Sequence, residues 1–267
     1  MSTPRALLDL SHRLADPAAD LVILGEGNTS ADLGDGSFAV KASGVPLGAV
    51  TADSFVRMGT DEVMAVVDDR ALDPGDQAAV AARLAGAGEA GAATPSIETM
   101  LHALGIALCG AAYVGHTHPT AVNALLCSDR AGELVAGHLF PDQVVVCGRH
   151  ALFVPYAEPG LALGRAVRDG LRNHLDAHGT PPKLIYLGNH GIVALGASAE
   201  EVHQVTAMSV KAARVLAGVL AVGRPAYLSA ASADALDARP DEHHRRRVLA
   251  GHGTEPHTAP RQTGTPA

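Results

Sequence analysis

Residues 111–126 read AAYVGHTHPTAVNALL, and in this stretch a strand pattern changes to a helix pattern. The first six are a short, mostly apolar run, which predicts a buried strand that ends at His116. Pro119 then begins a helix that continues to about Leu126, because proline is favoured in the first turn of a helix. A strand that passes directly into a helix predicts an α/β domain.

Helices and short strands alternate on both sides of this stretch. The apolar spacing and the turn signals predict helices over 4–16, 73–88, 159–178 and 198–220, a short one after Thr51, and one that starts at Pro95-Ser96 with Glu98 in its first turn. Strands are expected over 37–42, 62–68, 143–148, 151–156 and, broken at Asn189-His190-Gly191, 184–196.

No loop is long enough to mark a border between domains. We therefore expect one domain over 1–228 and a tail over 229–267. The tail is rich in Ala, Pro, Thr, His and Arg, so it can bury little apolar surface and should be mobile.

Composition limits the kind of partner. With 267 residues, of which 47% are hydrophobic, the chain can bury a sizeable core. The net charge of −8 and the absence of tryptophan argue against nucleic acid and against an anionic membrane surface. The longest stretch without Asp, Glu, Lys or Arg contains three histidines, so it is no transmembrane helix. Asp9 interrupts what would be a signal peptide, and three scattered cysteines are typical of a reducing compartment, so we expect a cytoplasmic protein.

His116 and His118 stand two residues apart at the end of the predicted strand, where both imidazoles can reach one point. They form a candidate pair of metal ligands. His190 lies at another break between strands, where a kinked backbone could aim it at the same centre. The alternative is that these histidines hydrogen-bond locally; a third histidine and a nearby acid favour the metal.

Glu98 is that acid. A glutamate in the first turn of a helix is ordinary, because it interacts favourably with the helix dipole. Beside a divalent metal, the same carboxylate could act as a general acid and base.

A second group of residues suits an anion. Asn28, Ser43, Gly44 and Ser96 offer neutral donors and close approach to the backbone, although such residues also occur in ordinary turns.

Six motifs occur in the order typical of the class II aldolase/adducin family, which this chain resembles over about residues 5–220. They are GNTS at 27–30, KASGVP at 41–46, PSIETMLH at 95–102, GHTHPTAVNAL at 115–125, VPYAEPG at 154–160 and GNHGIVALG at 188–196. The resemblance implies a three-layer α/β/α fold with a central, mostly antiparallel sheet flanked by helices. It also implies a homotetramer with sites between neighbouring subunits.

The resemblance further implies that His116, His118, His190 and Glu98 hold Zn²⁺, or another divalent metal such as Mn²⁺ or Co²⁺. Asn28, Ser43, Gly44 and Ser96 match the residues that bind the substrate phosphate in the family. Adducin-like members lack the metal histidines, whereas this chain keeps all three, so it resembles an enzyme.

Two positions depart from the family pattern. The family commonly has P-S-S-E where this chain has Ile97 in place of the second serine, which removes one phosphate donor. The family's fuculose-phosphate aldolases also supply a tyrosine proton donor in the stretch where this chain has His138 to Asp142. Either of these two residues could substitute for it.

The expected activity is a zinc-dependent aldolase that cleaves a ketose, in the first instance a ketose 1-phosphate, to a three-carbon ketone and an aldehyde. Glutamate at position 98 favours an aldolase over the related epimerases. The alternatives are a decarboxylase, an epimerase or a dehydratase of a sugar phosphate on the same metal site, or a non-catalytic adducin-like assembly module.

Overall fold

A seven-stranded sheet forms the centre of the computed structural model, which describes residues 4–89 and 93–239. The strand order is β3-β2-β1-β4-β7-β6-β5. Every neighbouring pair is antiparallel except β5 with β6. The strands are β1 (Asn28–Asp32), β2 (Ser37–Lys41), β3 (Phe55–Gly59), β4 (Tyr113–Thr117), β5 (Leu152–Val154), β6 (Leu184–Leu187) and β7 (Gly191–Gly196).

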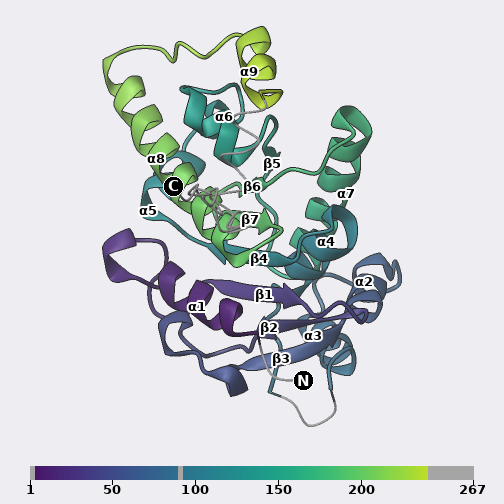
Figure 1. Cartoon of the computed structure of the whole chain (residues 1–267). Helices are drawn as coiled ribbons and strands as arrows, with labels where there is room; N and C mark the ends of the chain where they lie inside the picture. Colours follow the sequence, from purple (N-terminus) through teal and green to yellow (C-terminus); the bar gives the residue numbers. More distant parts are fainter. Residues whose placement is uncertain (1–3, 90–92, 240–267) are drawn as a thin grey trace, which may run out of the picture.

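Helices cover both faces of the sheet and enclose a separate apolar core on each (Figure 1). On one face lie α2 (Thr60–Asp68), α3 (Gln77–Gly86), α4 (Thr99–Cys109) and α7 (Leu161–His178). On the other face lie α1 (Arg5–Leu14), α5 (Thr120–Leu126), α6 (Pro141–Cys147) and α8 (Ala199–Val222). The three-layer α/β/α architecture with a mostly antiparallel sheet is therefore confirmed.

The segment that follows Thr51 differs from the sequence prediction. The strand is β3, and residues 62–68 form most of α2 instead of a strand. In β3 burial alternates along the chain, whereas in α2 the buried residues Val63, Val66 and Val67 follow the spacing of a helix face. Packing of that face against the core outweighs the strand preference of the valines.

The predicted strand over 143–148 is also wrong. Residues Pro141–Cys147 form α6, with proline at its first position and Asp142 in its first turn. Val144, Val145 and Cys147 are buried, so one side of this short helix is apolar. Of the predicted pair of strands, only β5 is present.

Helix α4 begins later than predicted. It starts at Thr99, and Glu98 is its N-cap residue rather than a member of its first turn. The preceding residues pair with the end of β2 instead, through a bridge between Ala42 and Pro95 and a hydrogen bond from Ser43 N to Thr94 O of 2.9 Å. This pairing ends at Pro95, and Ile97 and Glu98 form a turn before the helix begins.

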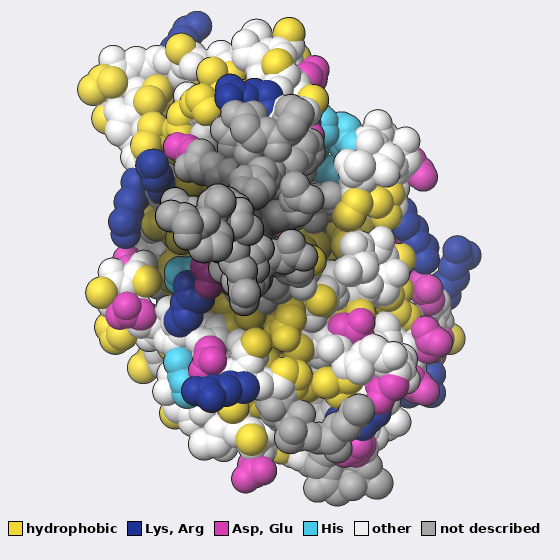
Figure 2. Space-filling model, viewed as in Figure 1, with side chains coloured by type: hydrophobic (Ala, Val, Ile, Leu, Met, Phe, Trp, Pro, Cys, Tyr) yellow, Lys and Arg dark blue, Asp and Glu magenta, His cyan; other side chains and the backbone are white. Residues whose placement is uncertain are grey.

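Helix α8 is long and apolar enough to cross a membrane by length and composition alone. Its face from Val202 to Leu216 is buried, and it packs on β4, β7, α1, α5 and α6. Beyond this face, Val222 is 89% exposed, and apolar side chains gather over this end of the helix at the upper left of Figure 2. The buried face is what a core helix requires.

The predicted tail begins with α9 (Ala230–Asp237), which packs on α6. The rest of the predicted tail, residues 240–267, lies outside the described residues.

Ser198 caps α8, because its side chain accepts a hydrogen bond of 3.2 Å from Glu201 N. Replacing Ser198 with alanine removes that acceptor and is expected to lower the free energy of unfolding by about 1 kcal/mol. Urea denaturation of Ser198→Ala and Ser198→Asp measures the effect, since aspartate can still cap. Equal stability of wild type and the alanine variant would contradict the capping role.

Candidate metal centre

His116 lies on β4, in the middle of the sheet, and is fully buried. It stands opposite Asn28 of β1 and Val193 of β7. Its Nδ1 lies 2.9 Å from the carbonyl oxygen of Ile192, which can only accept a hydrogen bond. Nδ1 therefore carries a proton, and Nε2 faces Glu98 and His118.

The turn between β6 and β7 brings His190 to the same point. Asn189 takes a left-handed conformation there, with φ of 54°. Gly191 follows, and a Cβ at that position would lie 2.5 Å from the carbonyl oxygen of Thr117 and 2.7 Å from Cδ2 of His118. Only glycine lets β7 approach the HTH segment this closely, which explains the Asn-His-Gly sequence.

Glu98 completes the cluster from the start of α4. Its Oε1 lies 3.0 Å from Nε2 of His190 and 3.4 Å from Nε2 of His116, while its Oε2 accepts a hydrogen bond of 2.9 Å from Nδ2 of Asn28. The Nε2 atoms of His116 and His118 are 2.9 Å apart. One ligand atom from each of the four residues lies within 4.8 Å of every other.

Burial and charge set the protonation of these groups. Burial by itself would raise the pKa of Glu98, but the neighbouring His116 and His190 outweigh it and hold this pKa well below its usual range. Burial, followed by the nearby His116 and His190, lowers the pKa of His118 to about 4. At neutral pH the cluster therefore contains a carboxylate and a neutral His118, the forms that bind a metal.

The donor set fits a divalent transition metal. Three imidazoles and one carboxylate are ligands that zinc takes in proteins, and a carboxylate that can be displaced leaves a position for substrate. Ligating histidines are commonly fixed through their second ring nitrogen. Ile192 O does this for His116, and Oε1 of Glu26 lies 3.5 Å from Nδ1 of His118. The four residues expected to hold the metal are thus brought together.

Of the four residues expected to bind phosphate, two adjoin the metal cluster and two lie in a neighbouring turn. Nδ2 of Asn28 lies 3.5 Å from Oγ of Ser96, and Oγ of Ser96 accepts from Glu98 N at 3.2 Å, so these two adjoin the metal cluster. Ser43 and Gly44 lie in the turn after β2, which the Ala42–Pro95 bridge and the Ser43–Thr94 hydrogen bond hold beside the Ser96 segment.

Three further residues around the centre were not anticipated from the sequence. Glu26 approaches His118, and its position directly before the Gly-Asn-Thr-Ser motif was the available signal. Lys41 is 2% exposed and donates to the carbonyl oxygens of Ala42 and Val45, which braces the Ser43-Gly44 turn. His102, fully buried one turn after Glu98, has its Nδ1 2.8 Å from Oγ of Ser30 on β1.

Gly27, directly before Asn28, has φ of +78°, and a Cβ there would lie 2.7 Å from Cγ1 of Val22 and 3.1 Å from the carbonyl oxygen of His116. His138, considered above as a proton donor, lines a different cavity and donates from Nε2 to the carbonyl oxygen of Gly148 at 3.1 Å. Asp142 lies in the first turn of α6.

Several solved structures share this fold. The N-terminal class II aldolase domain of a conserved protein from Thermoplasma acidophilum has a TM-score of 0.62 at 22% identity, covering 79% of this chain and 92% of that one. L-fuculose-1-phosphate aldolase from Thermus thermophilus has a TM-score of 0.57 at 18% identity, covering 83% and 96%. YgbL from Escherichia coli, described as a "putative aldolase/epimerase/decarboxylase", has a TM-score of 0.62 at 19% identity, covering 87% of this chain and 96% of that one.

Among curated proteins, YuxG from Bacillus subtilis (strain 168), named an uncharacterized oxidoreductase, is 32% identical over 112 residues. That match covers 42% of this chain and only 14% of YuxG. The model of the class II aldolase and adducin N-terminal domain matches residues 5–217. The fold and the cluster of three histidines and a glutamate are consistent with this match. The chain belongs to the class II aldolase and adducin N-terminal domain family.

Proposed function

We propose that this protein is a metal-dependent aldolase that cleaves a ketose, most simply a ketose 1-phosphate, to a three-carbon ketone and an aldehyde. The observation that carries the proposal is the convergence of three imidazoles and the Glu98 carboxylate within 4.8 Å. If substrate displaces the Glu98 carboxylate, the metal gains the open position that a structural zinc site does not have.

Bound zinc would supply a Lewis acid for the negative charge that develops on the carbonyl side of the substrate when the bond between its third and fourth carbons breaks. His116, His118 and His190 would hold it. Bond cleavage also requires a side chain of the protein that transfers protons from and to the substrate.

Glu98 is the residue placed for that movement. Its Oε1 faces the histidines that would hold the metal, so it can accept the proton of the hydroxyl that becomes the aldehyde, and the same proton can return to the three-carbon fragment. Asn28 holds one carboxylate oxygen by a hydrogen bond of 2.9 Å and leaves the other facing the histidines. Asn28 therefore orients the acid and base as well as offering a donor to substrate.

The two ends of the substrate have different surroundings. The phosphate would lie on Asn28, Ser43, Gly44 and Ser96. A cavity of about 410 Å³ lies beside His118, and Val22, Glu26 and Asn123 help to line it. Because this cavity offers carboxylate and amide groups, it suits the hydroxyls of the aldehyde fragment better than a second anion.

A screen of the zinc-loaded protein against ketose 1-phosphates, free ketoses and 3-oxo sugar acid phosphates tests the proposal. Formation of an aldehyde and a three-carbon ketone from a ketose phosphate is the expected result. Release of carbon dioxide from an oxo acid, with no cleavage of any ketose, would replace the aldolase with the decarboxylase.

Ile97 makes the phosphate site weaker than a second serine would. Its side chain packs toward Gly160, and a lost hydrogen bond to a charged group costs about 1.5–3 kcal/mol. Ile97→Ser is therefore expected to raise kcat/KM for the phosphorylated ketose by about tenfold or more. Steady-state kinetics with the unphosphorylated ketose is the control and should change little; an equal change in both substrates would contradict a phosphate contact.

A further inference from the structure

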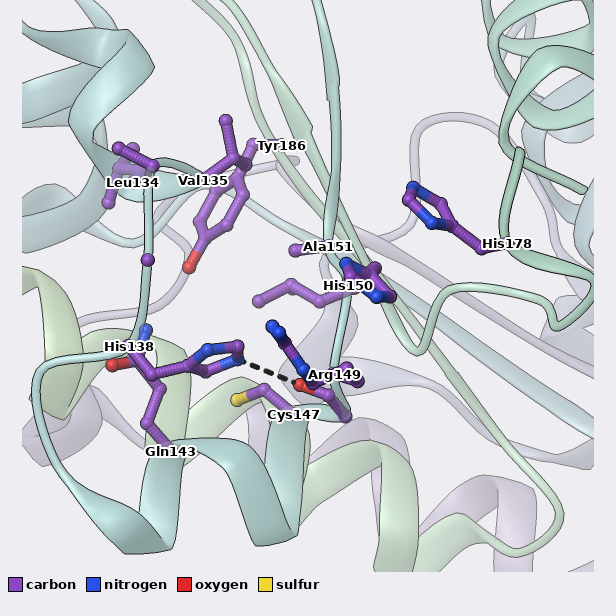
Figure 3. A pocket seen from close by; sticks show the side chains of 14 residues that line it. Leu134, Val135, His138, Gln143, Cys147, Arg149, His150, Ala151, His178 and Tyr186 are labelled. Carbon is purple, nitrogen blue, oxygen red and sulfur yellow. Dashed lines mark hydrogen bonds between the residues drawn. The ribbon is translucent and has the colours of Figure 1, made fainter. Parts of the chain in front are cut away.

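A second cavity, of about 400 Å³, lies between α6, the C-terminal end of α7 and β6 (Figure 3). It shares no lining residue with the metal cluster or with the cavity beside His118. Its size is at the small end of the range of ligand pockets, roughly 300–1,000 Å³. This cavity is therefore a site separate from the metal centre, and its polar groups can be considered on their own.

Tyr186 of β6 is the most informative of these groups. The residue is only 2% exposed, yet its hydroxyl points into the cavity and makes no hydrogen bond with any residue that the structure describes (Figure 3). Burial raises the pKa of this tyrosine, so the hydroxyl stays protonated. Because this hydroxyl opens onto the cavity and has no partner among these residues, it is available to a ligand.

Gln143 and His138 each present a polar group to the cavity. Whether that group donates or accepts is set by the hydrogen bond that the same side chain makes within the protein. Gln143 is 7% exposed, and its Oε1 accepts from Leu139 N at 2.8 Å, so its amide NH₂ is left as a donor. Nε2 of His138 donates to the carbonyl oxygen of Gly148, which makes its Nδ1 an acceptor. Burial lowers the pKa of His138, in keeping with a neutral ring.

Arg149 supplies the cavity with guanidinium donors. Its Nε donates to Oδ1 of Asp234 on α9 at 2.6 Å, which leaves its terminal N–H groups for other partners. Asp234 is 66% exposed and, like Asp237, does not belong to the lining. Among the described lining residues there is one guanidinium and no carboxylate. The terminal N–H groups of the guanidinium and the amide NH₂ are all donors, which is what a carboxylate ligand requires.

We propose that this cavity binds a small hydroxycarboxylate. Its carboxylate is held by Arg149 and the amide of Gln143, and its hydroxyl is held between the Tyr186 hydroxyl and Nδ1 of His138. The apolar part of the lining, which includes Leu134 and Val135, accommodates a short carbon chain. The ligand is thus a class of molecule distinct from the sugar phosphate proposed for the metal centre.

Calorimetric titration of the full chain with lactate tests this site, with propanoate and propane-1,2-diol as matched probes that lack the hydroxyl or the carboxylate. Lactate is expected to bind with a millimolar dissociation constant, at least tenfold more tightly than either relative. Absence of binding by lactate, or equal binding of all three compounds, would overturn the proposal.

Variants locate the binding. Tyr186→Phe removes only the unpartnered hydroxyl and should weaken lactate binding about tenfold or more without loss of folding. Gln143→Glu keeps the shape but places a negative charge in the cavity and should abolish binding. Tyr156→Phe, which removes the hydroxyl of a 54% exposed tyrosine outside the cavity, is the matched control and should bind as wild type does.

His118→Ala separates this site from the metal centre, because a hydroxy acid can also chelate a metal. Lactate binding that survives in His118→Ala and falls in Tyr186→Phe supports the second cavity. Binding that is lost in His118→Ala, or unchanged in Tyr186→Phe, refutes it. Neither result bears on whether the metal centre is an aldolase.

Discussion

Replacing His118 with alanine is expected to remove nearly all bound metal and nearly all turnover. Wild type should bind about one divalent ion per chain through three imidazoles, the usual number of protein ligands at a catalytic zinc. Loss of one of them leaves two imidazoles and a carboxylate that must also serve substrate. Elemental analysis after dialysis against zinc-free buffer measures the effect.

His118 is the best of the three histidines for this test. Its side chain is 19% exposed, against 0% for His116 and 10% for His190, so alanine leaves the smallest defect in the core. Circular dichroism should therefore match wild type. His203→Ala, outside the cluster, is the matched control and should keep its metal. A His118→Ala protein with full metal occupancy would contradict the assignment.

The metal cluster could be anticipated from the sequence because its ligands stand in short segments whose backbone is tightly constrained. His116 and His118 follow a buried strand, and His190 stands before a glycine that the structure requires, since any side chain at Gly191 would strike the HTH segment. The sequence next to each histidine was therefore enough to predict that their side chains converge.

Helices rich in valine could not be anticipated in the same way. The sequence predicts strands over residues 62–68 and 143–148, because β-branched residues prefer strands when only local preference is counted. Which side of each segment is buried depends on residues that are distant in the sequence. In both segments, packing of one apolar side against those residues stabilises a helix. The same reason hides Glu26, Lys41 and the cavity around Tyr186, whose contacts join residues far apart in the chain.

Replacing Glu98 with glutamine should lower turnover by about 10²–10⁴-fold, the range that general acid–base catalysis contributes. Glutamine has nearly the same shape, and its amide oxygen can still accept the hydrogen bond that Asn28 donates to Glu98. The amide cannot take up a proton at neutral pH, so the fold is kept while proton transfer is lost. Steady-state turnover of the zinc-loaded variant measures this, with metal content determined in parallel.

The nearby carboxylate of Glu26 provides the control for that experiment. It lies 3.5 Å from His118, but its Oε2 accepts a hydrogen bond of 2.9 Å from Ile23 N, and it is not one of the four clustered ligands. Glu26→Gln should therefore reduce turnover far less than Glu98→Gln. Metal content should fall less in Glu98→Gln than in His118→Ala, because all three imidazoles remain. If Glu98→Gln turns over at nearly the wild-type rate, a different residue must move the proton, and the role assigned to Glu98 is wrong.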